Sequence, residues 1–176
     1  MSSRPPVEAL KKLRAVVSDV DGVMTNAVKF YGVNGLELLG FNVRDGLGLY
    51  LLKRAGLLLA LVTTTDSDII SRRAADLEIS DVFRNVHDKR SALRAYRDAN
   101  NLAREEVLYV GDDLWDLEAF PEVGVRVAVA DADASVKEAA DWVTERRGGE
   151  GAIREIADAI LAAKGVNPLD LLRPQG

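Results

Sequence analysis

Acidic side chains, a hydroxyl and one lysine stand at the ends of four apolar segments of this chain. In chain order they are Asp19 and Asp21, then Thr63, then Lys89, then Asp112 and Asp113, with Asp116 one helical turn further on. Carboxylates at i and i+2 of an extended chain project to the same side, and they repel each other unless a cation lies between or beside them. Hard oxygen ligands without His or Cys favour Mg²⁺. The spacing therefore suggests magnesium chemistry.

The elements that must position these residues form an alternating pattern. Apolar runs predict buried strands, and 3.6-residue periodicity predicts helices between them. We expect strands at 15–17, 57–63, 81–84, 107–111, 125–129 and 141–144, and helices at 46–55, 67–78, 89–101, 114–120 and 152–164. Such alternation predicts an α/β fold, with a mostly parallel sheet and helices on both faces. Ligands bind at the carboxyl ends of such strands, so the residues above should meet at one edge.

A small hairpin interrupts the alternation. Residues 27–31 and 36–41 are β-prone runs on either side of the turn signature Gly32-Val33-Asn34-Gly35. The intervals from Asp19 to Thr63 and from Thr63 to Lys89 are filled by predicted elements, which leaves no room for a large cap domain. We therefore expect a single domain over 1–165 with a hairpin flap, and a C-terminal tail over 166–176.

Composition narrows the function classes. The 176 residues contain no cysteine and a single histidine, His87, which excludes disulfide scaffolds, Cys-ligated zinc and multi-histidine metal sites. A net charge of −5 argues against broad nucleic-acid binding. No apolar stretch reaches the ~18 residues that a membrane span needs. The first residues lack the apolar region of a signal peptide, so we expect a cytoplasmic protein without membrane or nucleic-acid partners.

Each candidate residue also has an ordinary structural interpretation. An Asp after a strand is often only a helix cap, which applies to Asp112 and Asp116. Thr63 alone is typical of a turn, and Lys89 alone is typical of a solvated helix. Their joint occurrence, in chain order and at four strand ends, argues against coincidence.

The ordered motifs resemble those of a known superfamily. Asp19-Val20-Asp21-Gly22-Val23, Thr63, Lys89 and Gly111-Asp112-Asp113 look like the four motifs of the haloacid dehalogenase-like hydrolases, over residues 14–160. The chain also resembles the 3-deoxy-D-manno-octulosonate 8-phosphate phosphatase family, which has relatives that act on nonulosonate 9-phosphates. This narrower likeness lies in Phe41-Asn42-Val43-Arg44-Asp45-Gly46, Val127-Ala128-Val129-Ala130-Asp131-Ala132 and Gly148-Gly149-x-Gly151-Ala152-x-Arg154-Glu155.

The resemblance implies a role for each residue in phosphomonoester hydrolysis. Asp19 would be the nucleophile that forms an aspartyl-phosphate, and Asp21 the general acid and then general base. Thr63 would donate to the phosphoryl group, and Lys89 would neutralise the phosphate and the nucleophile. Mg²⁺ would be bound by Asp19, Asp112 and the carbonyl group of Asp21. Asp113 and Asp116 would support that metal site. The substrate would be bound by Thr64, Arg44 and Asp45.

The resemblance also implies a homotetramer in which hairpins and neighbouring subunits close the uncapped site. The apolar residues of the hairpin suit such an interface, although they could instead pack on their own subunit; they are Val28, Phe30, Leu36, Leu38 and Leu39. Two departures stand out, because the family usually has Gly-Arg where Thr64 and Thr65 stand, and Arg at Glu150. Arg44 or Arg147 could replace the missing charge.

Three functions remain open. The first is a Mg²⁺-dependent phosphatase of a 2-keto-3-deoxy sugar acid phosphate, either octulosonate 8-phosphate or nonulosonate 9-phosphate. The second is a phosphatase of another small phosphorylated metabolite, and the third is a non-catalytic regulatory subunit with the same fold. A phospho-accepting receiver domain fits poorly, because the pair Asp112-Asp113 follows Lys89 instead of preceding it.

Overall fold

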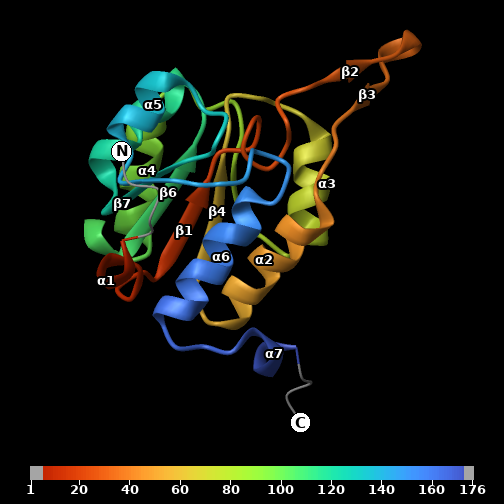
Figure 1. Ribbon diagram of the computed structural model, residues 1–176. Helices are drawn as coiled ribbons and strands as arrows, with labels where there is room; N and C mark the ends of the chain where they lie inside the picture. The colour runs from red at the N-terminus through yellow and green to blue at the C-terminus, as the bar shows by residue number, and fades with distance from the viewer. Residues whose placement is uncertain (1–5, 173–176) are drawn as a thin grey trace.

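A six-stranded parallel sheet forms the centre of the computed structural model, which describes residues 6–172 (Figure 1). The strand order is β5-β4-β1-β6-β7-β8, with bounds β1 Ala15–Ser18, β4 Leu58–Val62, β5 Asp81–Phe83, β6 Val107–Gly111, β7 Val125–Ala128 and β8 Trp142–Val143. Strand β1 pairs in parallel with both β4 and β6. The strand order therefore reverses at β1, and its carboxyl end is where such sheets bind ligands.

Helices cover both faces of the sheet, as Figure 1 shows. Helices α2 and α6 pack against each other on one face, and α4 lies on the other. The helices are α1 Val7–Leu10, α2 Val43–Arg54, α3 Asp68–Asp76, α4 Lys89–Ala99, α5 Ala134–Ala139, α6 Ala152–Ala163 and α7 Pro168–Leu171. Short 3₁₀ segments are η1 Val33–Gly35, η2 Arg104–Glu106, η3 Leu114–Glu118 and η4 Phe120–Glu122. The predicted α/β class with a parallel sheet is confirmed.

Helix α2 begins earlier in the chain than predicted. It begins at Val43 because the Asn42 side chain accepts a hydrogen bond from the Arg44 N–H at 2.8 Å. Leu47 is 36% exposed, whereas Gly48 is buried. A Cβ on Gly48 would lie 3.1 Å from the Arg154 Cα, so this glycine permits the close approach of α2 and α6.

Other elements differ at their ends or were missed. The predicted helix over 114–120 consists of the two 3₁₀ segments η3 and η4. Helices α1 and α5 were not predicted, because each is too short to show a helical period. The tail contains α7, and residues 173–176 of the tail lie outside the described residues.

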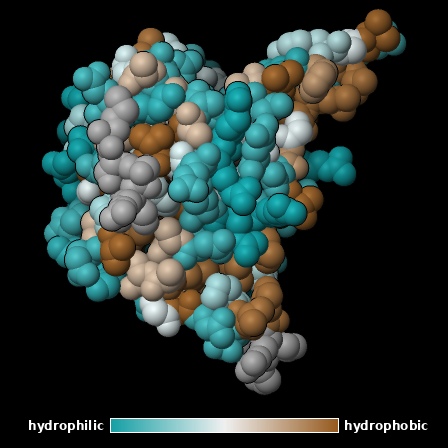
Figure 2. All heavy atoms as spheres, viewed as in Figure 1, coloured by the Kyte–Doolittle hydropathy of each residue, from teal (hydrophilic) through white to brown (hydrophobic). Residues whose placement is uncertain are grey.

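The hairpin projects away from the sheet (Figure 1). Its strands are only β2 Phe30–Tyr31 and β3 Glu37–Leu38, shorter than the predicted runs, with η1 at the tip. Phe30, Leu36 and Leu38 are 59%, 55% and 54% exposed, and Figure 2 shows brown, hydrophobic side chains on this projection. Leu39, in contrast, packs against the core. Within one chain, the apolar side chains near the tip therefore have no core to cover them.

Among residues 6–172 no large cap domain accompanies the sheet, as predicted from the motif intervals. No helix in this described part of the chain has the length and apolar character that crossing a membrane requires.

Candidate active site

A cavity of about 160 Å³ lies at the carboxyl ends of β1, β4 and β6. Most of the predicted site residues line it, together with Ala27 and Trp115: these are Asp19, Asp21, Thr64, Lys89, Asp112, Asp113 and Asp116. The parallel strands thus bring residues from distant parts of the sequence to one edge, as expected. Thr63, the residue before Thr64 in the chain, is fully buried.

Lys89 is the centre of the buried charge cluster. Its Nζ lies 2.6 Å from Asp19 Oδ1 and 2.7 Å from Asp116 Oδ1, and all three residues are buried. Asp88 caps the start of α4 by accepting from the Ser91 N–H at 2.9 Å, which orients Lys89 at the first position of the helix. Lys89 is therefore a fixed cation between two carboxylates.

Asp116 organises the loop after β6. The Tyr109 hydroxyl donates to Asp116 Oδ1 at 2.5 Å, and the N–H groups of Asp112 and Asp113 donate to Asp116 Oδ2 at 2.8 and 3.1 Å. Both oxygens of Asp116 are thus engaged. Asp113 is exposed and accepts from the Leu114 N–H at 2.7 Å, so it caps the 3₁₀ segment η3.

The cluster carries more negative charge than Lys89 balances. Burial raises the pKa of Asp19 well above its usual value, and the nearby Asp116 carboxylate adds to this while Lys89 opposes it. Burial, then Asp116 and Asp113, raise the pKa of Asp112 to about 7. Burial tends to lower the pKa of Lys89, but the carboxylates of Asp19 and Asp116 raise it overall. A second cation would relieve this repulsion.

The donor set fits a hard divalent cation. Asp19, Asp112 and Asp116 each offer a carboxylate oxygen, and these atoms lie within 4.8 Å of one another. Because both oxygens of Asp116 are already engaged, Asp19 and Asp112 are the side chains best able to hold the ion. Their approach depends on Gly22, where a Cβ would lie only 2.0 Å from Asp112 Oδ2. All-oxygen ligation of this kind suits Mg²⁺.

Asp21 is held by groups on its other side. The Thr63 hydroxyl donates to Asp21 Oδ2 at 3.2 Å and accepts from the Thr65 N–H at 3.0 Å. Lys29 Nζ lies 3.4 Å from Asp21 Oδ1 and donates to Thr65 Oγ1 at 2.7 Å. Sequence reasoning missed Lys29, whose only signal was a charge within an otherwise apolar hairpin arm.

Two predicted substrate-binding residues lie elsewhere in this chain. Asp45 is buried, and its carboxylate accepts from the N–H groups of Gly151 at 3.1 Å and Arg154 at 2.8 Å. It therefore caps the N-terminus of α6, which is a structural role. Arg44 lines a separate cavity of about 580 Å³ together with Arg146 and Arg154.

The glycine-rich segment before α6 also has a packing role. Gly148 approaches the carbonyl oxygen of Gly22 so closely that a Cβ would lie 1.7 Å from it, and the Gly149 N–H donates to the Val23 carbonyl at 2.9 Å. Glu150 is exposed and does not line the cavity. Arg147, the other residue considered as a replacement cation, pairs with Asp131 at 3.2 Å.

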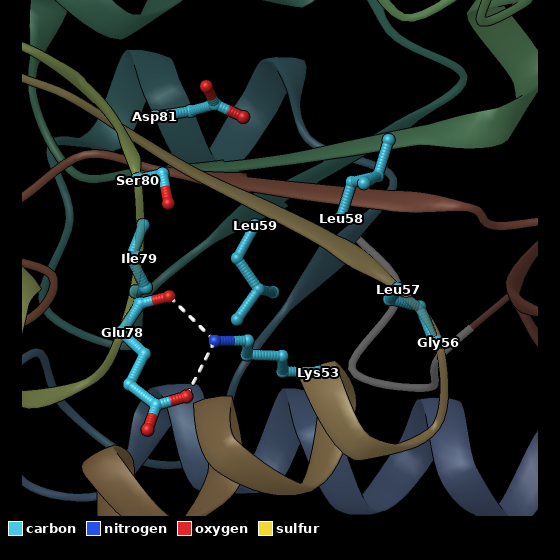
Figure 3. Close-up of a pocket in the computed structure, with 9 residues that line it drawn as sticks. All are labelled: Lys53, Gly56, Leu57, Leu58, Leu59, Glu78, Ile79, Ser80 and Asp81. Atoms are coloured by element: carbon cyan, nitrogen blue, oxygen red, sulfur yellow. Dashed lines mark hydrogen bonds and ion pairs between the residues drawn. The ribbon is translucent and has the colours of Figure 1, made fainter.

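Another cavity, of about 310 Å³, lies at the opposite end of the sheet, beside the first residues of β4 and β5 (Figure 3). Leucines and Ile79 line it, and Lys53 donates to the Glu78 carboxylate at 2.9 Å across it. It is larger than the cavity at Asp19, but it lacks a cluster of converging acidic groups around a buried cation. The candidate active site is therefore the cavity at the carboxyl ends of the strands.

Asp45→Ala is expected to lower the free energy of unfolding by about 1–3 kcal/mol, because the N–H groups at the start of α6 lose their acceptor. The kcat/KM of the folded variant should stay within about twofold of wild type. Urea denaturation and phosphate-release assays measure both quantities. A large loss of activity without a loss of stability would instead support the predicted substrate-binding role of Asp45.

Asp112 is expected to make the metal-free protein less stable as the pH rises. Its pKa of about 7 exceeds its usual value of 3.8, so the folded state binds more protons than the unfolded state between these values. The free energy of unfolding should then fall by about 2 kcal/mol from pH 4 to pH 7 on this account, allowing for solvent screening. Urea denaturation in EDTA measures the fall. Asp112→Asn should remove this contribution, and an unchanged pH profile in that variant would contradict it.

Known proteins are similar to this chain in sequence and in fold. Residues 62–156 match the family model of haloacid dehalogenase-like hydrolases. The chain belongs to this family. A 3-deoxy-D-manno-octulosonate 8-phosphate phosphatase from Haemophilus influenzae is 40% identical over 158 residues, which cover 90% of this chain and 88% of that protein. The predicted family resemblance is thereby confirmed.

Solved structures agree in fold. The phosphatase of the same name from Moraxella catarrhalis, in complex with a magnesium ion, a phosphate ion and a KDO molecule, is 34% identical, with a TM-score of 0.88 and coverage of 90% of this chain and 91% of that one. A hypothetical protein from Xanthomonas campestris is 37% identical, with a TM-score of 0.92 and coverage of 100% and 97%. This member of the haloacid dehalogenase-like hydrolases is a phosphatase, and its acidic cluster suits a divalent metal.

Proposed function

We propose that this phosphatase hydrolyses a 2-keto-3-deoxy sugar acid phosphate in a Mg²⁺-dependent reaction, with 3-deoxy-D-manno-octulosonate 8-phosphate as the first candidate substrate. The observation that carries the proposal is the contact of Lys89 with Asp19 at 2.6 Å, beside Asp112, in a cavity at the switch point of the sheet. The similarity to named octulosonate 8-phosphate phosphatases supports the substrate class. A nonulosonate 9-phosphate is the second candidate.

Asp19 is the proposed nucleophile. Its carboxylate attacks phosphorus, the bond from phosphorus to the ester oxygen breaks, and an aspartyl-phosphate forms. Lys89 holds Asp19 in place and balances part of the charge that the phosphate brings. Asp19, Asp112 and the backbone carbonyl of Asp21 would hold Mg²⁺, which would supply Lewis-acid stabilisation of the charge on the phosphoryl group.

Asp21 is the proposed acid and base. It gives its proton to the leaving alkoxide and then takes one from the water that hydrolyses the aspartyl-phosphate, which releases inorganic phosphate. In the ligand-free chain the Thr63 hydroxyl orients Asp21 at 3.2 Å. With substrate present, Thr63 and Thr64 are proposed to contact the phosphoryl group. Asp113 and Asp116 support the loop that carries Asp112.

The direct test is phosphate release from a panel of phosphorylated sugar acids, sugars and other metabolites, with Mg²⁺ and with EDTA. Release from octulosonate 8-phosphate in Mg²⁺ alone, with a kcat/KM above about 10⁵ M⁻¹s⁻¹, supports the proposal. Preference for an uncarboxylated ester favours a phosphatase of another metabolite. No release from any ester favours a non-catalytic subunit. A cytoplasmic location is also part of the proposal, and cell fractionation tests it.

A homotetramer is the proposed assembly, with the hairpins between subunits. The apolar side chains near the hairpin tip support it, because Phe30, Leu36 and Leu38 are each more than half exposed within one chain. Phe30→Asp and Leu38→Asp are each expected to convert the tetramer to smaller species and to lower activity at the same time. Light scattering at micromolar concentration measures the mass. Val7→Asp, at an apolar residue that is 48% exposed on α1, is the control and should leave the mass unchanged. A monomeric wild type would contradict the assembly.

A further inference from the structure

Lys29 places a positive charge at the edge of the candidate active site. It lies two residues after Ala27, which lines the cavity, and precedes β2 in the hairpin arm. Its Nζ donates to Thr65 Oγ1 at 2.7 Å and lies 3.4 Å from Asp21 Oδ1. The Lys29 side chain is 26% exposed, so it is only partly buried at this edge of the site.

Lys29 and Lys89 contact different parts of the site. Lys89 is buried against Asp19, the proposed nucleophile, on the side where the phosphoryl group would bind. Lys29 is beside Asp21, which is proposed to protonate the leaving alkoxide. The charge of Lys29 is therefore on the side of the leaving group, which in a sugar acid phosphate also carries a carboxylate.

Lys29 also contacts Thr65, at a position where the family usually has an arginine. An arginine was expected at Thr65, and its absence removes a cation from the loop after β4. The structure places the ammonium of Lys29 on the Thr65 hydroxyl at 2.7 Å, so the hairpin arm brings a cation to the loop after β4. Neither of the two arginines considered as replacements brings a cation to Thr65, because Arg147 pairs with Asp131 and Arg44 lines another cavity.

We infer that Lys29 is a specificity-determining residue that binds the carboxylate of the leaving group. The inference rests on the proposed function, which makes the substrate a sugar acid phosphate. An ammonium on a flexible four-carbon stem can leave Asp21 and Thr65 for a substrate anion. Its hydrogen bond to a carboxylate is charge-assisted, which makes it stronger than a neutral one.

The test compares a carboxylated and an uncarboxylated substrate. The ratio of kcat/KM for octulosonate 8-phosphate to that for arabinose 5-phosphate is measured in wild type and in Lys29→Met. We expect the ratio to fall by about 10- to 100-fold, as for the loss of one charged hydrogen bond. Lys29→Arg should keep most of the ratio, and Thr65→Arg in the Lys29→Met background should recover part of it. Lys53→Met, which removes the ion-paired lysine at the opposite end of the sheet (Figure 3), is the matched control and should leave the ratio unchanged.

The outcomes separate this role from the proposed function. If wild type hydrolyses octulosonate 8-phosphate but Lys29→Met keeps the wild-type ratio, or loses activity on both esters equally, the role of Lys29 is overturned and the proposed function stands. If wild type does not hydrolyse any sugar acid phosphate, the proposed function fails and this role fails with it. Circular dichroism of each variant confirms that the fold is retained.

Discussion

Asp19→Asn is expected to lower phosphate release by at least about 10⁴-fold, because the amide oxygen cannot attack phosphorus as a carboxylate does. The substitution keeps the size of the side chain and leaves Lys89 paired with Asp116 at 2.7 Å, so the protein should still fold. Initial rates of phosphate release at saturating Mg²⁺ measure the loss. Acid-quenched wild type should carry a phosphoryl group that is labile to hydroxylamine, and the variant should not.

Asp76→Asn serves as the control for Asp19→Asn. It makes the same chemical change at an exposed position on α3, away from the cavity, and should keep wild-type rates. An Asp19→Asn variant within about tenfold of wild type would remove Asp19 from the nucleophile role. Asp21→Asn should also block turnover, but it leaves the proposed nucleophile in place and is expected to accumulate the phosphoenzyme.

Lys89→Met is expected to lower the free energy of unfolding of the metal-free protein by about 3–5 kcal/mol, and to abolish activity. Removing the ammonium leaves the buried carboxylates of Asp19 and Asp116 without their shared cation, which costs far more than the loss of an exposed ion pair. Urea denaturation in EDTA at neutral pH measures the loss. Because an unpaired buried carboxylate is tolerated once it is protonated, the destabilisation should shrink toward pH 5.

Lys53→Met is the matched control, since it breaks an exposed lysine–glutamate pair and should cost less than about 1 kcal/mol. Adding Asp116→Asn to Lys89→Met should recover part of the lost stability, because one of the two unpaired charges disappears. A loss as small as that of the control would mean that Lys89 does not hold the buried carboxylates together.

Local patterns were sufficient to predict most of the sheet and the place of the site. The run 107–111 predicted β6 with its observed ends, because five consecutive apolar or small residues suit a strand buried on both faces. The order of Asp19, Thr63, Lys89 and Asp112 predicted their meeting, because parallel strands bring their carboxyl ends to one edge. Spacing alone predicted only a magnesium site. The resemblance added phosphomonoester hydrolysis as the expected reaction.

Sequence spacing does not give the contacts that a residue makes with a distant partner. Asp45 follows the start of a helix and sits in a family-like segment, which favoured substrate binding. Its actual partners, the N–H groups of Gly151 and Arg154, are more than a hundred positions away and meet it only when α6 packs on α2. Lys29 was missed for the same reason, since its contacts with Thr65 and Asp21 depend on where the hairpin arm crosses the cavity.

The sequence by itself determined the fold class, the parallel sheet and the set of residues at its carboxyl edge, because these follow from short-range periodicity and from the rule that ligands bind at strand ends. Only the tertiary structure decided how the charges divide: Lys89 is shared by Asp19 and Asp116, Asp45 caps α6, and Lys29 stands beside Asp21. The physical reason is that hydrogen bonds and ion pairs act over a few ångströms between side chains far apart in the chain, and one-dimensional spacing does not contain those distances.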